Sequence, residues 1–478
     1  PGLKSPLDIG LAGPVSSIIL SESLFRFCGN IEKYPALVQL LERNPPKLLG
    51  LDTGTNLADF QSVSKLNELF SMLDHSLVFM QGPPGTGKTY LTSRVIVNLI
   101  SRGFKIGVTS NSHKAILNML QKIVNHAKKA KVGFRGAKKS AKDDPSQHFN
   151  QSSTEDSFIV DLFKVDELID GDFDLLAGTA WFFANERLNQ KIDFLIIEEA
   201  GQMSLATGIA AATCAKSLIL VGDQNQLEQP IQGIHPNDSG MSVINYYLKK
   251  DQTSGEIHSV VPEDKGIFLN KTYRLHPKIC DFVSEVFYES RLLPLKKNKE
   301  RELVWEGKLS DDHKKAGVQL VLSDHEGCSK VCSIEANEVK RIYKTLLQHA
   351  SLKVGEERWK ISVEDILVVA PYNMQVELLK TILPVGSKVG TIDKFQGQEA
   401  EVVIVSMTTS SPEEIGRDAN FLFSKNRLNV AITRAKCLAV VVFNERLLTF
   451  PCRTPEQINL LNTFCWLYRR YASEADDN

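Results

Sequence analysis

The chain has 478 residues, a length that allows about three domains. Of these residues 42% are hydrophobic, which is ordinary for a globular protein with a buried core. Its 56 Lys and Arg balance 57 Asp and Glu to a net charge of -1. This excludes a global basic field for nucleic acid, so any such binding must come from local patches. No apolar run approaches the roughly 20 residues of a membrane-spanning helix, and the N-terminus does not resemble a signal peptide.

The eight cysteines are scattered along the chain, which favours a reducing, intracellular compartment. Only Cys328 and Cys332 lie close together, and their spacing alone does not predict a zinc site. Because the sequence opens on Pro1 rather than on a methionine, we expect it to be a piece of a longer protein.

Residues 1–50 carry apolar residues at helical spacing and are predicted to form an N-terminal helical segment. Over 51–265, strand-like and helix-like stretches alternate, as expected of a parallel α/β domain. A region over 124–172 interrupts this alternation. It holds seven Lys or Arg between Lys128 and Lys142 and is predicted to be a small, partly flexible basic insertion.

A second strand–helix alternation over 266–460 contains near-continuous apolar runs at 366–370, 402–406 and 438–443, which are typical of buried parallel strands. The predicted fold is therefore α/β with two parallel-sheet domains. A C-terminal tail is expected over 461–478.

The stretch FMQGPPGTGKTYLT at 79–92 carries the strongest chemical signal. An apolar run, a G-x-x-x-x-G-K-T loop and helical spacing follow one another, which is the order of a phosphate-binding P-loop. Its glycines let backbone N–H groups turn toward phosphate, and the helix N-terminus adds its dipole. Lys88 would reach the β- and γ-phosphates, and the Thr89 hydroxyl would bind Mg²⁺. The predicted cradle consists of Gly82, Pro84, Gly85, Thr86, Gly87, Lys88 and Thr89.

Two more apolar runs end in polar residues that would complete a triphosphate site. DFLIIEEAGQ at 193–202 places Glu198 to hold the metal, directly or through water, and Glu199 to polarise the attacking water. LILVGDQNQLEQP at 218–230 is predicted to place Asp223 and Gln226 beside the γ-phosphate.

The second half of the chain has no P-loop of its own but supplies Arg274, Arg427 and Arg434 in the stretches LNKTYRLHP and NRLNVAITRAK. If the nucleotide lies between two sheets, these arginines can grip the γ-phosphate only when the cleft closes. Closure on the phosphate would turn hydrolysis into motion.

The ordered motifs GPPGTGKT, EEAGQ, GDQNQL, YRLHP, VGTIDKFQGQEAEVVIVSM and RLNVAITRAK resemble those of superfamily 1 helicases. They are similar to the 5′→3′ branch that holds the nonsense-mediated-decay RNA helicase and the nuclease–helicases of DNA replication. TSNSHKA, AGTAWFFA, GIFLNKTYRLHP and CRTPEQ resemble in particular the helicase half of bacterial fusions with a RecB-like nuclease.

This resemblance implies two RecA-like domains that use ATP and Mg²⁺ to move 5′→3′ on single-stranded DNA, with a role in DNA repair. It implies a monomer in the bacterial cytoplasm, and it suggests a nuclease domain outside this chain as a partner. One position departs from the family pattern, because Glu198 stands where the family usually has Asp.

The resemblance also implies roles for individual residues. Lys88, Glu199, Arg274 and Arg434 form the catalytic group. Gln61 would contact adenine, and Tyr273 and Tyr372 would flank the base. Further nucleotide contacts fall on Gln202, Gln396, Gly397 and Glu399. The strand path would cross Thr109, Asn111, His113, Lys114 and Thr179 in the first domain, and Pro371 and Thr391 in the second.

Three alternatives remain at this stage. A nucleotide-gated module could clamp nucleic acid without moving, although an intact Lys88, Glu199 and Arg434 argue against an inactive switch. A GTPase is disfavoured because no [NT]-K-x-D guanine-reading motif follows the P-loop and GTPases lack a second sheet. RNA stays open beside DNA, because the discrimination depends on contacts to the 2′-hydroxyl.

Overall fold

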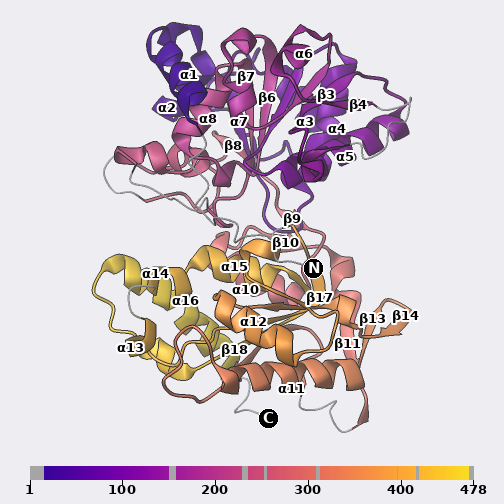
Figure 1. Cartoon of the computed structure of the whole chain (residues 1–478), viewed down its shortest axis with the longest axis vertical. Coiled ribbons are helices and arrows are strands. Elements are labelled where there is room, and N and C mark those ends of the chain that lie inside the picture. The colour runs from indigo at the N-terminus through magenta and orange to yellow at the C-terminus, as the bar shows by residue number, and fades with distance from the viewer. Residues whose placement is uncertain are drawn as a thin grey trace, which may run out of the picture.

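The computed structural model describes residues 16–149, 158–228, 235–251, 256–307, 313–395, 397–415 and 419–472. Two α/β domains lie one above the other (Figure 1). The first is built on an eight-stranded sheet in the order β4-β3-β5-β2-β6-β7-β1-β8, and the second on a five-stranded sheet in the order β12-β18-β17-β15-β16. All neighbouring strands in both sheets are parallel, so the predicted fold of two parallel-sheet domains is confirmed.

The elements of the first domain follow from its hydrophobic pattern, since its central strands are buried and its helices have one apolar face. Its strands are β1 (Leu77–Gln81), β2 (Ile106–Thr109), β3 (Gly136–Lys139), β4 (Ile159–Leu162), β5 (Leu175–Ala177), β6 (Ile192–Glu198), β7 (Ala215–Gly222) and β8 (Gly266–Phe268). Its helices are α1 (Ile18–Cys28), α2 (Pro35–Glu42), α3 (Val63–Ser71), α4 (Lys88–Ser101), α5 (His113–Ala130), α6 (Val165–Asp170), α7 (Ala180–Phe183), α8 (Leu205–Ala212) and α9 (Val243–Tyr247).

The second domain repeats this arrangement and adds two small sheets, one of β9 and β10 and one in the order β11-β13-β14. Its strands are β9 (Lys271–Thr272), β10 (Leu293–Pro294), β11 (Arg301–Trp305), β12 (Gly317–Leu322), β13 (Ala350–Val354), β14 (Glu357–Lys360), β15 (Ile366–Val369), β16 (Lys388–Gly390), β17 (Ala400–Ser406) and β18 (Ala435–Phe443). Its helices are α10 (Pro277–Phe287), α11 (Ser333–His349), α12 (Asn373–Ile382), α13 (Pro412–Ile415), α14 (Ala419–Leu422), α15 (Lys425–Thr433) and α16 (Pro455–Ala472).

Helices cover both faces of each sheet, so each domain has a core on either side. In the first domain, α3, α4 and α5 pack on one face, and α1, α2, α7 and α8 on the other. In the second, α11 and α12 cover one face, and α10, α15 and α16 the other. None of the described helices is both long and apolar enough to cross a membrane.

Two predicted boundaries differ from the structure, and the N-terminal segment joins the first domain. This segment contains the helices α1 and α2, and α2 packs on β1, where the Gln39 side chain bonds both backbone groups of Leu77 at 2.7 and 2.8 Å. The second domain does not begin at Gly266, because β8 pairs with β1 in the first sheet. The tail does not begin at residue 461, since α16 continues to Ala472 with Phe464 and Leu467 buried.

The basic insertion is also different from the prediction. Its first residues complete α5, and β3 and β4 add two parallel strands to the edge of the first sheet. The many polar residues of this lysine-rich stretch masked the apolar pattern of a buried strand. Ala137 and Ile159 are nevertheless buried in the core. The region is therefore an ordered sheet extension over the part that the structure describes.

Candidate active site

A cleft of about 390 Å³ lies between the two domains, with the P-loop on one side. The first sheet presents the carboxyl ends of its strands to this cleft, because β1 leads into the P-loop and β6 ends at Glu198. The lining residues come from both domains and are Pro83, Pro84, Gly85, Thr86, Gly87, Lys88, Thr89, Asn118, Lys122, Glu199, Gln226, Tyr273, Arg274, Arg301, Gly397, Glu399, Arg434 and Lys436. The P-loop and the arginines of the second half thus share one cavity.

The P-loop is packed directly against the start of the second domain. Gly85 has a φ of 76°, and a Cβ on it would lie 2.4 Å from the Cβ of Arg274. The Gly85 carbonyl accepts from the Tyr273 N–H at 2.8 Å, and the Thr272 hydroxyl donates to the Pro84 carbonyl at 2.9 Å. Only glycine combines the left-handed backbone with this close approach.

Lys88 and Thr89 lie beside the two carboxylates that the sequence predicts for hydrolysis. The Lys88 ammonium is 3.5 Å from Glu199 Oε1, and the Thr89 hydroxyl donates to Glu198 Oε1 at 2.7 Å. The second oxygen of Glu198, Oε2, is buried with no hydrogen-bond partner among the described residues. An unpaired carboxylate oxygen beside a hydroxyl suits a hard cation such as Mg²⁺, so the residues present fit the predicted metal.

Burial and the neighbouring Glu199 raise the pKa of Glu198 to about 7, against the opposing charge of Lys88. A cation at Oε2 would stabilise the charged carboxylate and remove this penalty. Glu199 itself has a φ of 54°, in the left-handed region that non-glycine residues rarely adopt. Because of this turn, the two consecutive carboxylates point to different places. Glu198 lies against the P-loop helix, and Glu199 lines the cleft.

Asp223 and Gln226, both predicted to lie beside the γ-phosphate, take different positions. Gln226 lines the cleft, whereas Asp223 is buried behind it and accepts from the Gln226 amide at 2.7 Å. Asp223 also accepts from the Tyr288 hydroxyl at 2.7 Å, and Tyr288 accepts from the Asn429 amide at 3.0 Å. Burial raises the pKa of Asp223. Asp223 therefore connects Gln226 to α15 of the second domain instead of facing a phosphate.

Arg434 is a nearly buried cation in the cleft wall. It is 5% exposed, and one guanidinium N–H donates to the Gln398 carbonyl at 3.1 Å. Its Nε has no hydrogen-bond partner among the described residues. Burial, with Arg274 nearby, lowers the pKa of Arg434 to about 10. A phosphate oxygen would supply the missing acceptor and the missing negative charge.

Arg274 is held by Glu399 in a chain of alternating charges. Arg274 Nε donates to Glu399 at 2.6 Å, and Lys436 lies 2.9 Å from the other oxygen of Glu399. Lys436 also lies 3.6 Å from Glu401, which pairs with Arg301 at 3.2 Å. Burial alone would raise the pKa of Glu399, but Arg274 and Lys436 hold it below its ordinary value. Glu399 thus supplies the negative charge between Arg274 and Lys436 in the cleft wall.

Several predicted nucleotide contacts lie away from the described lining of the cleft. The Gln61 amide donates to the Ala58 carbonyl at 2.8 Å and accepts from the Asn270 N–H at 3.4 Å. The Tyr372 ring packs against Phe421, with ring centroids 5.8 Å apart. Tyr273, in contrast, lines the cleft with a 58% exposed side chain. Gln396 lies outside the described residues.

Arg427 does not join the other two arginines. It pairs with Asp393 at 2.9 Å and lies over the Phe421 ring, 4.1 Å from its centroid. Of the three arginines predicted to grip the γ-phosphate, only Arg274 and Arg434 line the cleft.

Sequence reasoning missed four polar residues of the cleft, namely Asn118, Lys122, Arg301 and Lys436. Asn118 and Lys122 follow Lys114 at spacings of four on α5, so one helix face carries all three, and this periodicity could have identified them. No sequence pattern marked Arg301 as a cleft residue, because β11 is brought to the cleft only by the packing of the second domain. Six cations in the lining outnumber the carboxylates Glu199 and Glu399, which suits a triphosphate.

A second cavity, of about 290 Å³, extends from the cleft toward the predicted nucleic-acid surface. It shares Thr89, Glu199 and Gly397 with the cleft and adds Gln202 and Lys114. The Asn111 amide donates to the Gln202 carbonyl, which ties the loop after β2 to the loop after β6. The predicted contacts to γ-phosphate and to strand are therefore neighbours in space.

The other predicted strand contacts follow the carboxyl ends of parallel strands. Thr109 ends β2, Thr179 caps α7 after β5, Pro371 follows β15 and Thr391 follows β16. Thr109 is fully buried, so only its neighbours can reach a ligand. His113 is half-buried beside the Lys138 ammonium, at 3.5 Å.

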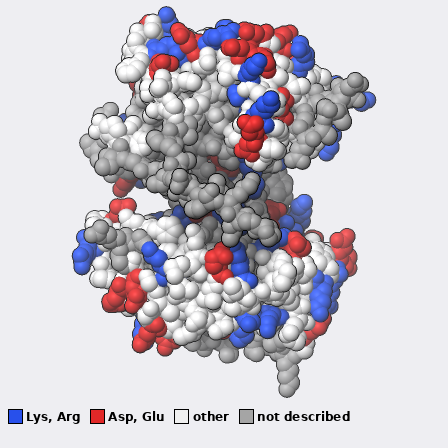
Figure 2. Space-filling model, viewed as in Figure 1, with Lys and Arg blue, Asp and Glu red and all other residues white. Residues whose placement is uncertain are grey.

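The basic region contains a mixture of exposed and buried cations. Lys128, Lys129, Lys131 and Arg135 are exposed, whereas Lys138 is fully buried and donates to Ser140 at 2.9 Å. Burial lowers the pKa of Lys138 to about 8. The seven cations of this stretch are therefore not equally available to a ligand, since the Lys138 ammonium is enclosed by the protein. Figure 2 shows Lys and Arg interspersed with Asp and Glu on the face that it presents.

Comparisons with known proteins find matches over both halves of the chain. Residues 67–231 and 247–446 each match a family model described as an AAA domain. The chain is 26% identical over 417 residues to the DNA replication ATP-dependent helicase/nuclease DNA2 of Homo sapiens, covering 80% of this chain and 36% of that protein. It is 26% identical over 437 residues to the DNA polymerase alpha-associated DNA helicase A of Schizosaccharomyces pombe, covering 77% of this chain and 61% of that protein.

Among solved structures, Arterivirus nonstructural protein 10, a helicase in complex with DNA, has a TM-score of 0.40 and 14% identity. That match covers 81% of this chain and 62% of the other. The chain spans about a third of the length of the first curated relative. Both curated relatives named above are eukaryotic, and the particular resemblance to bacterial nuclease fusions stays a prediction.

Proposed function

We propose that this chain, a superfamily 1 helicase with an AAA domain in each half, hydrolyses ATP to move 5′→3′ along single-stranded DNA. The observation that carries the proposal is the shared cleft. Arg274 and Arg434 of the second domain line the same cavity as Lys88 and Glu199 of the first. A nucleotide bound there would contact both domains at once.

The charge chain suggests how the nucleotide would draw the domains together. Without a phosphate, Glu399 holds Arg274. A γ-phosphate would compete with Glu399 for Arg274 and would offer the acceptor that Arg434 lacks. Mg²⁺, held by Thr89 and Glu198, would neutralise charge on the β- and γ-phosphates. After hydrolysis, Arg274 would return to Glu399 and the attraction across the cleft would weaken.

Two hydrogen-bond routes start at the cleft, one crossing into the core of the second domain and one leading to the predicted strand surface. One runs from Gln226 through Asp223 and Tyr288 to Asn429 in the second domain. The other links Gln202, in the cavity beside Glu199, to Asn111 after β2. These contacts support coupling between the state of the bound nucleotide and the affinity for single-stranded nucleic acid.

The test measures ATP turnover without polymer and with single-stranded DNA, single-stranded RNA or duplex DNA. We expect single-stranded DNA to raise turnover at least several-fold, because a bound strand would bring the two halves of the cleft together. If no polymer changes the ATPase rate, the proposal of a translocating helicase is wrong, and a module that binds nucleic acid without moving is favoured. Duplexes with single-stranded tails then test the rest. A 5′ DNA tail should support unwinding. A requirement for a 3′ tail would contradict the proposed direction of movement. Better unwinding of RNA than of DNA would contradict the proposed substrate.

A second prediction concerns the exposed cations at the end of α5. Changing Lys128, Lys129 and Lys131 to Ser should flatten the salt dependence of single-strand binding. Each lost phosphate contact should remove about 0.7 from the slope of log affinity against log salt concentration. Fluorescence anisotropy over a range of KCl concentrations gives this slope.

The matched control changes three exposed cations of the β13–β14 hairpin, Lys353, Arg358 and Lys360, to Ser. This control should leave the slope unaltered, because it removes the same charge from another part of the molecule. Equal slopes for both triple variants would show that the α5 lysines are only a solvated face.

A further inference from the structure

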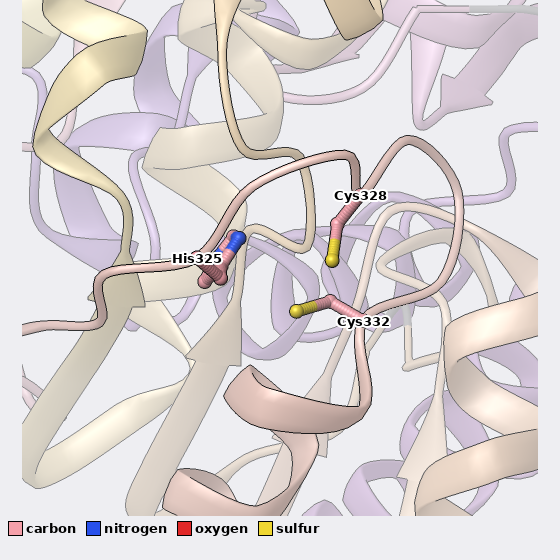
Figure 3. Close-up of side chains that lie close together, drawn as sticks. All are labelled: His325, Cys328 and Cys332. Atoms are coloured by element: carbon pink, nitrogen blue, oxygen red, sulfur yellow. The ribbon is translucent and has the colours of Figure 1, made fainter.

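The loop between β12 and α11 brings together three side chains that bind metals in other proteins. His325, Cys328 and Cys332 each offer one ligand atom, and these atoms all lie within 4.8 Å of one another. Figure 3 shows the imidazole and the two sulfur atoms turned toward one common space. Their sequence spacing had given no reason to expect this, because the histidine arrives from the end of β12 and Cys332 from the start of α11.

The cluster is enclosed and fixed by backbone contacts. His325 and Cys332 are 3% and 1% exposed, and Cys328 is half-buried. Cys332 caps α11, with its Sγ accepting from the Glu335 N–H at 3.4 Å. Solvent therefore reaches the group from the side of Cys328.

A carboxylate orients the histidine. His325 Nε2 donates to Glu335 Oε2 at 3.2 Å, while Glu335 Oε1 accepts from the Ser406 hydroxyl and from the Thr408 N–H at 2.7 Å. Because this carboxylate acts as an acceptor, the ring proton belongs on Nε2 and Nδ1 is an acceptor. Nδ1 accepts from the Ser410 hydroxyl at 2.7 Å, and the Ser410 oxygen accepts from the Cys328 N–H at 2.9 Å, so Nδ1 is on the side of the cysteines. A metal bound at Nδ1 would replace the hydrogen bond from Ser410.

We propose that His325, Cys328 and Cys332 bind a Zn²⁺ ion, with water in the fourth tetrahedral position. Zn–S bonds of about 2.3 Å and Zn–N bonds of about 2.0 Å require ligand atoms roughly 3.3–3.8 Å apart. Because all three ligand atoms lie within 4.8 Å of one another, a small closure of the loop is enough to reach this spacing. Two thiolates and an imidazole favour zinc over the hard cations Mg²⁺ and Ca²⁺. Each thiol gives up its proton to solvent on binding, and the carboxylate–histidine–metal order matches the usual support of a zinc ligand.

The ion would tie a loop to the carboxyl edge of the second sheet. The Cys332 N–H donates to the Gln375 side chain at 2.8 Å, and the Gln375 amide donates to Ser406 at the end of β17 at 3.1 Å. Gln375 lies in the first turn of α12, directly after Pro371 and Tyr372. Zinc would thus fix the loop between β12 and α11 next to the start of α12 and the end of β17, which Gln375 already links to Cys332.

The test measures zinc in the whole chain, purified with a thiol reductant and dialysed against zinc-free buffer. After loading with ZnSO₄ and removal of unbound ion, mass spectrometry of the metal should find about one equivalent per chain. The double variant Cys328→Ser/Cys332→Ser should lose it. The matched control, Cys452→Ser/Cys465→Ser, removes two half-buried thiols from another part of the second domain and should keep it.

A second measurement does not depend on the variants folding. Co²⁺ added to the unaltered protein should give the intense near-ultraviolet absorption of thiolate-to-cobalt charge transfer, and Zn²⁺ should abolish it. Absence of this band, zinc retained equally by both double variants, or a Cys328–Cys332 disulfide in the reduced preparation would each overturn the proposal. Retained zinc with a cobalt–thiolate spectrum, lost in the first double variant alone, would establish it.

Discussion

Replacing Arg434 with Ala should slow ATP hydrolysis by at least about a hundredfold and leave ATP binding nearly unchanged. Arginine fingers contribute on the order of 10³–10⁵ in turnover, roughly 4–7 kcal/mol at 1.36 kcal/mol per decade. Arg434 fits this role because its guanidinium is buried in the cleft wall with an unpaired Nε. Its interaction with the γ-phosphate would be strongest when the cleft is closed and charge develops in the transition state. Single-turnover hydrolysis and binding of a fluorescent ATP analogue separate the two effects.

Two comparison variants make this result specific. Lys88→Ala should weaken ATP binding as well as hydrolysis, because Lys88 lies in the P-loop and meets the phosphates in the open cleft. Arg427→Ala removes the same kind of side chain seven residues earlier, from a pair with Asp393 outside the cleft, and should hydrolyse at nearly the parental rate. If Arg434→Ala stays within about tenfold of the parent, closure of the two domains on the phosphate is wrong. Melting curves check that all three variants fold.

Replacing Glu199 with Gln should lower the hydrolysis rate by about two to four decades, because a positioned general base contributes typically 10²–10⁴. Glutamine preserves the size of the side chain and its left-handed turn but cannot accept the proton of the attacking water. ATP binding should persist, since the phosphates are held by Lys88 and the P-loop. Single-turnover rates at saturating ATP measure the chemical step directly.

The neighbouring carboxylate provides the contrast. Glu198→Gln should raise the Mg²⁺ concentration needed for half-maximal hydrolysis, because it removes the charge beside Thr89 that would hold the ion. Glu199→Gln should not raise that concentration, since loss of its charge lowers the pKa of Glu198 toward the ordinary value. The same Mg²⁺ dependence in both variants would contradict the division of tasks between these two residues.

The sequence by itself determined the parts of this protein whose chemistry depends on neighbours along the chain. The P-loop, the paired carboxylates after β6 and the two parallel sheets could be predicted, because phosphate binding and strand burial each leave a local pattern. Gly85 illustrates this, since its left-handed φ is required by the loop itself. The residue pattern alone offered Arg274, Arg427 and Arg434 without distinction, and only the resemblance to the helicase family selected Arg274 and Arg434, the two that line the cleft.

Only the tertiary structure decided which distant side chains share an environment. Packing buries Lys138 within a lysine-rich stretch, withdraws Asp223 behind Gln226, and brings Arg301 and Lys436 to the cleft. It also turns a run that looked like an insertion into two edge strands. His325 and Cys332 meet because one parallel strand ends where the next helix begins. Burial, pairing and strand order depend on contacts between residues far apart in sequence, and a local pattern carries no record of those contacts.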